Sequence, residues 1–254
     1  MDASVARATS SADRELGLGS DAALLVLTGA GVSAESGLPT YRGSGGLWRS
    51  HAFERLASPE GFREDPALVW RFYSERREAA LRAQPNAGHQ ALAEAERRLG
   101  ERFLLVTQNV DGLHRRAGSE RLVEIHGRLL GTRCSRCSRP ESADETAYPE
   151  GEVPRCERCG AALRPAVVWF GESLDPAHLE AVHDFLDRWR GRRLVFLAAG
   201  TYGAVWPAAG FVDVARSRGA ETWLINAERA DNAGRFDHVR EGPSGTLLPA
   251  MLGS

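Results

Sequence analysis

Short apolar runs without polar alternation are the feature that most restricts how this chain can fold. They are rich in Val, Leu and Ile, as expected of strands in a parallel sheet that helices cover on both faces. These runs are Ala23–Thr28, Phe103–Thr107, Leu122–Ile125, Ala166–Trp169, Leu194–Ala198 and Thr222–Asn226. Helical patterns separate most of them, at Asp65–Ala83, His89–Leu99, Pro176–Arg190 and Pro207–Arg218. Strands that alternate with helices predict an α/β fold with a doubly wound parallel sheet.

Two segments interrupt this alternation and predict a smaller second domain. Residues 43–100 form a glycine-rich loop followed by helices, and residues 127–165 contain four cysteines and little apolar periodicity. We assign segments 21–48, 101–126 and 166–254 to the sheet domain, 49–100 to a helical insertion, 127–165 to a cysteine-containing insertion, and 1–20 to a flexible N-terminus. A ligand is then expected in the cleft between the two domains, outside the carboxyl ends of the strands.

The balance of charges argues against nucleic acid as a partner. The 254 residues include 32 basic and 34 acidic side chains, for a net charge of -2, whereas nucleic-acid-binding domains are usually strongly basic. The N-terminus lacks the apolar core of a secretion signal, and glycines and Pro207 interrupt the longest uncharged stretch, Leu194–Val212. We therefore expect a cytoplasmic protein that binds neither nucleic acid nor membranes.

Four cysteines occur as two close pairs with the spacing of a zinc site. Cys134 and Cys137 are separated by two residues, as are Cys156 and Cys159, and 18 residues lie between the pairs. Four thiolates at this spacing bind Zn²⁺ tetrahedrally in a zinc ribbon and leave no position open for water. The site is therefore predicted to be structural, with unligated or redox-active thiols as the alternative.

A glycine-rich turn follows the first apolar run. Gly29, Gly31 and Ala34 match the G-x-G-x-x-G/A fingerprint of Rossmann-like dinucleotide-binding domains. Small residues there let the backbone approach a pyrophosphate, which N–H groups at a helix start attract, although they also suit a plain strand-to-helix turn. A dehydrogenase would continue with a second strand ending in an acidic residue. Here a long loop, Ser36–Trp48, follows, which disfavours hydride transfer and indicates chemistry on the dinucleotide itself.

Polar residues also follow two later strands, where sites of α/β proteins usually lie. Gln108, Asn109 and Asp111 come after Phe103–Thr107, and their amide and carboxylate groups suit ribose hydroxyls and a carboxamide, or simply cap the next helix. His126 comes after the next run. A histidine titrates near neutral pH, which makes His126 a candidate base. The alternative is that it is a structural residue.

Taken together and in this order, the motifs resemble those of the sirtuin family, the NAD-dependent protein lysine deacylases. The matching blocks are GAGVSAESGLPTYRG (Gly29–Gly43), TQNVDGLH (Thr107–His114), EIHG (Glu124–Gly127), the two cysteine pairs, VVWFGE (Val167–Glu172) and, more weakly, INAE (Ile225–Glu228). The resemblance implies NAD as co-substrate, one structural Zn²⁺ per chain, and acylated lysine side chains of proteins as substrates. The implied products are nicotinamide, O-acyl-ADP-ribose and free lysine.

The resemblance also implies roles for individual residues. The acyl-lysine carbonyl oxygen attacks C1′ of the nicotinamide ribose, and His126 then acts as the base that takes a proton from the ribose hydroxyls. Asn109 and Asp111 are implied to line the nicotinamide pocket, with Asn109 in the catalytic set, and Gln108 to contact the ribose. The implied NAD-contacting residues are Gly29, Ala30, Gly31, Ser33, Ala34, Glu35, Thr40, Tyr41, Arg42, Trp48, Gln108, Asn109, Val110, Asp111, Gly200, Thr201, Tyr202, Asn226, Glu228 and Ser244. Tyr202 departs from the Ser that the family usually has after Gly-Thr, so we expect an altered NAD contact there.

A Tyr-x-x-Arg pair on one predicted helix bears on the acyl group. Tyr73 and Arg76 share a helix face, and a phenol beside a guanidinium can hold a carboxylate, although a half-buried Tyr beside a solvated Arg is the plainer interpretation. The sirtuin subclass that removes succinyl, malonyl or glutaryl groups carries this pair and a small residue in the preceding loop, which Ala57 matches. The resemblance therefore implies a preference for acidic acyl groups, with deacetylation as a further activity. The remaining residues implied to contact the substrate are Val168, Phe170 and Gly171.

Two other functions remain open at this point. A protein ADP-ribosyltransferase would use the same NAD cleft, and its product would gain the mass of ADP-ribose instead of losing an acyl group. A non-catalytic NAD-sensing module would release no nicotinamide, and Tyr202 is the only sequence feature that favours it.

Overall fold

The parallel sheet predicted from the apolar runs is present and is the larger of two sheets. The structure is a computed structural model and describes residues 16, 18–19, 21–40 and 55–253. Within these residues the large sheet has six strands in the order β3-β2-β1-β7-β8-β9, and every pairing is parallel. Its strands are β1 (Ala23–Thr28), β2 (Phe103–Thr107), β3 (Leu122–Glu124), β7 (Leu194–Ala199), β8 (Glu221–Asn226) and β9 (His238–Glu241). The order reverses between β1 and β7, so a crevice is expected there at the carboxyl ends of the strands.

The two central strands explain why the apolar runs do not alternate. All six residues of β1 and all six of β7 are buried. Leu25 and Leu27 of β1 belong to the core on one face of the sheet, whereas Leu24 and Val26 belong to the core on the other face. Because helices cover both faces, nearly every position of these strands needs an apolar side chain.

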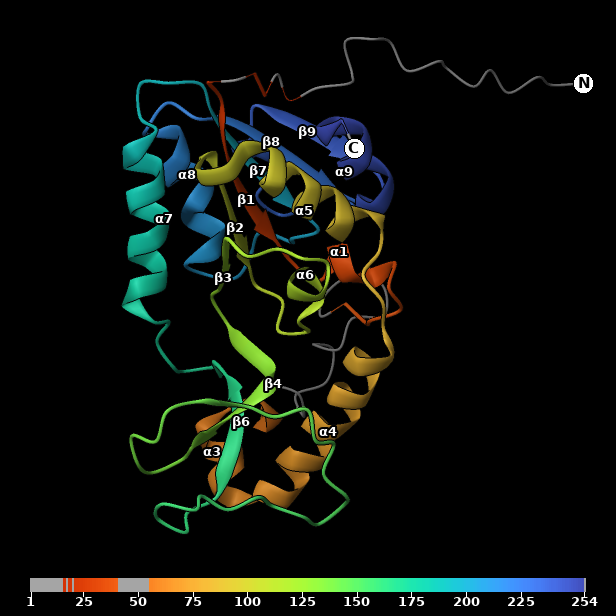
Figure 1. Cartoon of the computed structure of the whole chain (residues 1–254), viewed down its shortest axis with the longest axis vertical. Coiled ribbons are helices and arrows are strands. Elements are labelled where there is room, and N and C mark those ends of the chain that lie inside the picture. The colour runs from red at the N-terminus through yellow and green to blue at the C-terminus, as the bar shows by residue number, and fades with distance from the viewer. Residues whose placement is uncertain (1–15, 17, 20, 41–54, 254) are drawn as a thin grey trace, which may run out of the picture.

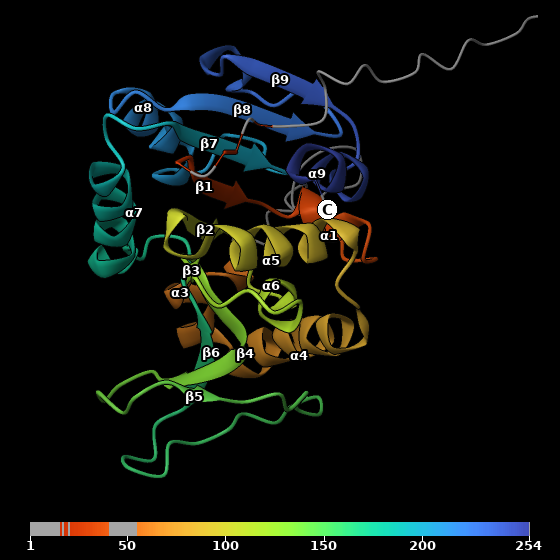
Figure 2. The ribbon, with the colours of Figure 1, turned by 45° about the horizontal axis from the view of Figure 1, so that its top comes forward.

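Helices cover both faces of the large sheet, as Figures 1 and 2 show. The helices α5 (Ala87–Leu99) and α9 (Ser244–Leu252) pack on one face. The helices α7 (Pro176–Arg188) and α8 (Phe211–Arg216) pack on the other face. Shorter helical turns in this part of the chain are α1 (Gly31–Ala34), η3 (Gly100–Arg102), α6 (Leu113–Arg116), η4 (Ala208–Gly210) and η5 (Ala233–Arg235).

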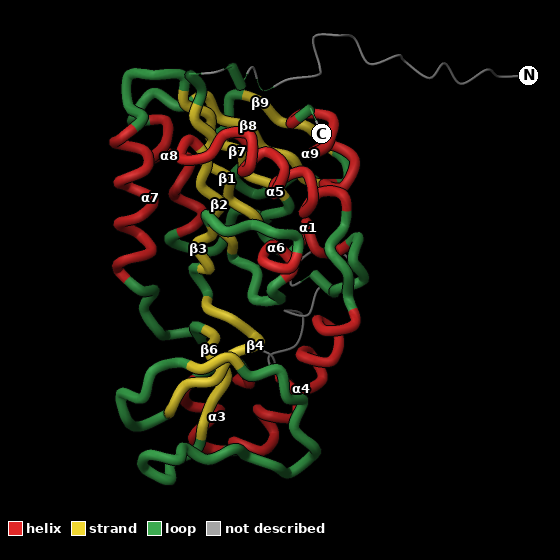
Figure 3. The backbone as a smooth tube through the Cα atoms, in the orientation of Figure 1, coloured by secondary structure: helices red, strands yellow, loops and turns green. Residues whose placement is uncertain are grey.

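A second unit lies below the large sheet in Figure 3 and is called here the small module; it comprises residues 55–83 and 127–172. It contains α3 (Pro59–Glu64), α4 (Pro66–Arg82) and, among the described residues, a three-stranded sheet in the order β5-β4-β6. The strands of this sheet pair antiparallel and are β4 (Gly127–Cys134), β5 (Ser142–Ala143) and β6 (Leu163–Val167). The small module has its own apolar core, which includes Phe62, Val69, Trp70, Tyr73, Leu129, Val167 and Trp169.

Side-chain caps fix where the main helices begin. The Asp65 carboxylate accepts a hydrogen bond from the Leu68 amide, and Pro66 takes the first position of α4. The Asn86 side chain caps α5, and Asp175 caps α7. The predicted helices at these three places are confirmed, apart from a few terminal residues. No helix among the described residues is long and apolar enough to cross a membrane.

Two expectations about the elements need correction, and two elements of the larger domain were missed. The run Ala166–Trp169 is not a strand of the parallel sheet, because its first two residues end β6, which pairs antiparallel with β4 in the small module. An apolar run shows that a strand is buried but not which sheet buries it. The predicted helix Pro207–Arg218 is a 3₁₀ turn followed by the shorter α8. The elements β9 and α9 were not predicted, because β9 is polar and α9 contains Pro249.

Candidate active site

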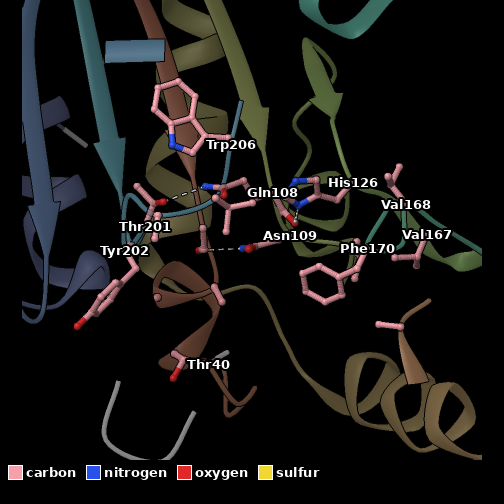
Figure 4. A pocket seen from close by; sticks show the side chains of 18 of the residues that line it. Thr40, Gln108, Asn109, His126, Val167, Val168, Phe170, Thr201, Tyr202 and Trp206 are labelled. Carbon is pink, nitrogen blue, oxygen red and sulfur yellow. Dashed lines mark hydrogen bonds between the residues drawn. The ribbon is translucent and has the colours of Figure 1, made fainter. Parts of the chain in front are cut away.

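A cavity of about 690 Å³ lies at the carboxyl ends of the central strands, between the large sheet and the small module. The turns after β1, β2, β7 and β8 form one wall, and α4 with the turn after β6 forms the other. In Figure 4, Gln108, Asn109 and Thr201 lie on the sheet side, and Val168 and Phe170 lie on the side of the small module. The cavity therefore occupies the crevice expected from the reversal of strand order.

The glycines of the first turn serve close backbone packing. A Cβ atom on Gly31 would lie 2.7 Å from the Gly200 Cα atom, and one on Gly200, where φ is +61°, would lie 2.3 Å from the Val32 nitrogen. The Gly31 amide donates to the Gly200 carbonyl oxygen at 2.9 Å, and the amides of Val32 and Ser33 also donate to backbone carbonyls. These three amides therefore do not supply the free N–H groups that were expected at the start of α1. The small residues instead let the backbones of the turns after β1 and β7 pack directly against each other where they line the cavity.

His126 lines the cavity two residues after the end of β3. Its Nδ1 atom lies 3.0 Å from the Gln108 carbonyl oxygen. Because a carbonyl oxygen can only accept, Nδ1 carries the proton of the neutral ring and Nε2 is the basic nitrogen. Burial lowers the pKa of His126 below its usual value of 6.5, and the bond to Gln108 opposes part of this effect. The neutral, basic form therefore dominates at neutral pH.

Gln108 and Asn109 tie the turn after β2 to the neighbouring turns. The Gln108 side-chain amide donates to the Thr201 hydroxyl at 2.9 Å, which joins it to the turn after β7. The Asn109 side-chain amide donates to the Gly29 carbonyl oxygen and to the Ser33 hydroxyl, both at 3.1 Å. These bonds hold both carboxamides in fixed orientations at the cavity wall.

A buried polar network stands behind Asn109. The Ser33 hydroxyl donates to the Asp111 carboxylate at 2.8 Å, and the Leu113 amide donates to the same carboxylate at 2.9 Å. Burial raises the pKa of Asp111, and these two bonds act in the opposite direction. Ser33 and Asp111 are 2% and 8% exposed and are not among the residues that line the cavity. Both were expected to contact NAD, but here they support the residue that lines the wall.

His89 belongs to the same network and was missed by sequence reasoning. Its Nδ1 atom accepts from the Asn86 amide, and its Nε2 atom lies 3.4 Å from the Ser33 hydroxyl. Burial lowers the pKa of His89 to about 4, so the ring is neutral. The only sequence sign was the Asn-x-x-His spacing of a helix cap, in which Glu or Gln is the usual second residue.

The other residues expected to contact NAD fall into three groups. One group lines the cavity and includes Gly29, Ala30, Gly31, Ala34, Thr40, Val110, Gly200, Tyr202, Asn226 and Glu228. Glu35 and Ser244 do not line it; the Glu35 carboxylate accepts from the Gly245 amide at 2.7 Å, beside Ser244 at the start of α9. The third group, Tyr41, Arg42 and Trp48, lies outside the described residues. Sequence reasoning also missed an apolar part of the wall, formed by Leu174, Leu179, Val205, Trp206 and Pro207.

The residues expected to contact the acyl group lie together on the opposite wall. Tyr73 and Arg76 of α4 line the cavity, as do Ala57, Val168, Phe170 and Gly171. The Trp169 indole N–H donates to the Tyr73 hydroxyl oxygen at 2.9 Å. The Arg76 guanidinium donates to the Phe72 carbonyl oxygen at 2.9 Å and lies over the Phe72 ring. A cation and a phenol therefore face the same cavity as the His126 base.

The four cysteines of the small module fit a zinc ion. Their sulfur atoms all lie within 4.8 Å of one another, with 3.5 Å between Cys134 and Cys159 and 3.7 Å between Cys137 and Cys156. Zn–S bonds of about 2.3 Å in a tetrahedron place sulfur atoms about 3.8 Å apart. The backbone amides of Arg136 and Cys137 donate to the Cys134 sulfur atom at 3.4 Å and 3.3 Å, and such donors stabilise a thiolate. Four thiolates complete the tetrahedron, so Zn²⁺ here is structural.

Comparisons with known proteins agree with this geometry. A family model described as the Sir2 family matches residues 29–207. The NAD-dependent protein deacylase sirtuin-5, mitochondrial, of Canis lupus familiaris is 44% identical, covering 90% of this chain and 80% of that protein. An NAD-dependent protein deacylase of Thermococcus kodakarensis is 43% identical, covering 90% and 89%. The crystal structure of a Sir2 homolog–NAD complex is 41% identical, with a TM-score of 0.82, covering 91% of this chain and 88% of that chain.

Proposed function

The chain belongs to the Sir2 family, and from that premise we propose that its cavity catalyses NAD-dependent deacylation of protein lysine side chains, with a preference for acyl groups that end in a carboxylate. One observation carries the proposal. A single cavity is lined by the His126 base on the sheet side and by Tyr73 and Arg76 on the side of the small module. The relatives described as NAD-dependent protein deacylases support the reaction, and the Tyr73–Arg76 pair supports the acidic acyl group.

The sheet side of the cavity handles the coenzyme. NAD supplies the ADP-ribose group that accepts the acyl chain. Asn109, held by Gly29 and Ser33, presents its carboxamide to the nicotinamide end, and Gln108 presents its carboxamide to the ribose. His126 takes a proton from a ribose hydroxyl through Nε2, because Nδ1 donates to the Gln108 carbonyl.

The small module handles the acyl chain. The Arg76 guanidinium is charged at every physiological pH, and with the Tyr73 phenol it offers charge-assisted hydrogen bonds to a carboxylate. Ala57 is 6% exposed and its small side chain leaves room along the cavity wall. An acetyl group ends before it can reach these donors, so it gains nothing from them.

A panel of acyl-lysine peptides tests both parts of the proposal. Mass spectrometry with NAD should show succinyl-lysine turned over faster than acetyl-lysine, with loss of the acyl group and release of nicotinamide. His126→Ala should abolish both reactions. Arg76→Met should cost about 2 kcal/mol of transition-state binding, or about thirtyfold in kcat/KM, for succinyl-lysine alone.

Arg71→Met is the matched control for Arg76→Met. Arg71 is on the same helix but is exposed and pairs with Glu150 at 2.8 Å, away from the cavity. This variant should keep the wild-type preference. A peptide that gains the mass of ADP-ribose would instead identify a transferase, and acetyl-lysine turned over far faster than succinyl-lysine would refute the acidic preference.

We also propose that the protein works in the cytoplasm. The four cysteines of the small module are free thiols, not disulfides, and so can bind Zn²⁺. Thiols persist in a reducing compartment such as the cytoplasm. The proposed activity requires only acylated protein lysines and NAD, and it involves neither nucleic acid nor a membrane.

A further inference from the structure

Trp169 connects the acyl side of the cavity to the core of the small module. The residue comes two positions after the end of β6, and its side chain is 3% exposed and contacts the Phe62 ring at 5.3 Å between centroids. Its Nε1 atom donates to the Tyr73 hydroxyl oxygen at 2.9 Å. The indole is therefore the direct hydrogen-bonding neighbour of the phenol that is proposed to bind the acyl carboxylate.

An ion pair holds this indole in one orientation. The Arg164 guanidinium lies 3.3 Å from the Trp169 ring centroid and donates to the Glu172 carboxylate at 2.9 Å. The same carboxylate accepts from the Trp169 backbone amide at 2.8 Å and from Arg133 at 3.0 Å. Arg164 is only 7% exposed, so water screens this pair weakly. The turn from Trp169 to Glu172 is therefore fixed at both its backbone and its ring.

The donor and acceptor atoms of the two side chains determine how the bond from Trp169 orients the Tyr73 hydroxyl. An indole N–H can only donate, so it occupies a lone pair of the phenol oxygen and turns the phenol hydrogen away from Trp169. A hydroxyl that accepts one hydrogen bond also donates a stronger one. The cation over the indole draws electron density from the ring, which strengthens the N–H donor further. Each effect makes Tyr73 a better donor to a carboxylate.

We propose that Trp169, which also lines the cavity, is a specificity-determining positioning residue: its N–H acts through Tyr73 to strengthen binding of acidic acyl groups, and this hydrogen bond has no part in binding an acetyl group. This inference rests on the proposed function. It assigns the selectivity for acidic groups to three side chains, Tyr73, Arg76 and Trp169. Phenylalanine at position 169 would fill most of the same space but could not donate to Tyr73.

The test is the change Trp169→Phe, measured as separate kcat and KM values for succinyl-lysine and acetyl-lysine peptides at saturating NAD. Loss of one hydrogen bond should lower kcat/KM for succinyl-lysine about five- to tenfold, mainly through KM, and leave acetyl-lysine within about twofold. Trp169→Met, which also lacks the donor, provides a second variant if the first does not fold. Equal losses for both peptides would show a purely structural role and overturn the inference.

Trp70→Phe is the matched control. Trp70 is also buried in the core of the small module, and its Nε1 atom donates to the Leu163 carbonyl oxygen at 2.8 Å, but it does not line the cavity. This variant loses the same kind of bond and should become less stable to heat, yet it should keep the wild-type ratio of succinyl to acetyl turnover. A changed ratio would contradict the assignment to Trp169.

A double-mutant cycle separates the inference from the function on which it rests. In a Tyr73→Phe background, Trp169→Phe should cause no further change in the ratio of the two activities. If Tyr73→Phe and Arg76→Met both leave the ratio unchanged, the acidic preference itself is wrong. If they reduce the ratio while Trp169→Phe does not, the preference stands and the role of Trp169 is refuted.

Discussion

Arg77 offers the most stringent test of how the small module is held together. Its side chain is 0% exposed, and its guanidinium donates to the carbonyl oxygens of Leu129 at 2.9 Å, Gly131 at 2.8 Å and Thr146 at 2.8 Å. The same group lies 3.2 Å from the Asp144 carboxylate. Helix α4 is thereby fastened to β4 and to the loop that follows β5.

The change Arg77→Met keeps a stem of similar length and removes every donor. It leaves three backbone carbonyls and one carboxylate without this partner. Breaking a buried ion pair costs about 3–5 kcal/mol, and we expect the free energy of unfolding to fall by this amount. The individual carbonyl penalties do not add to it in full, because the energies of contacts that share one side chain are not additive. In a chain of this size the loss corresponds to about 6–20 °C in Tm.

Urea denaturation followed by tryptophan fluorescence measures this loss, because Trp70 and Trp169 both lie in the core of the small module. A chromogenic chelator added in parallel should detect zinc release at lower urea than in the wild type. Arg71→Met, on the exposed face of the same helix, should shift neither midpoint. Indistinguishable midpoints for the two variants would refute the reasoning.

Three further predictions follow from the site. Because burial lowers the pKa of His126, kcat/KM should rise with pH through a midpoint below 6.5, and a midpoint above 6.5 in a pH–rate profile would contradict the assignment. Removing zinc with a chelator should lower the thermal midpoint and activity together, and added zinc should restore both. Gly200→Ala should abolish NAD binding in calorimetry, whereas Gly191→Ala, also at positive φ but in open space, should preserve it.

The parallel sheet was predictable because strands buried on both faces consist almost entirely of apolar residues, as β1 and β7 do along their whole length. The strand β9 is polar, because it lies at the edge of the sheet, where half of its residues are exposed. The run Ala166–Trp169 is apolar but was assigned to the wrong sheet, since its burial comes from α3 and α4 rather than from the large sheet.

The residue types of the site were predictable, but which of them line the cavity was not. Asn109 and Asp111 are two positions apart in the chain and are both buried, yet Asn109 lines the cavity and Asp111 does not. This difference depends on how Ser33 of α1 packs against the turn after β2, which no local pattern encodes. For the same reason nothing in the sequence pointed to the bond between Trp169 and Tyr73, whose partners are 96 positions apart.

On helix α4, Tyr73 and Arg76 line the cavity, and Trp70 and Arg77 contact the small module's sheet and its flanking loops; Tyr73 also belongs to the core of the small module. Substitution of Arg76 can therefore change which acyl chains are accepted without removing a core side chain and without changing the residues of the coenzyme wall. Changes in substrate choice at this position carry little risk to folding, whereas changes at Tyr73, Trp70 or Arg77 disturb the core or the buried ion pair.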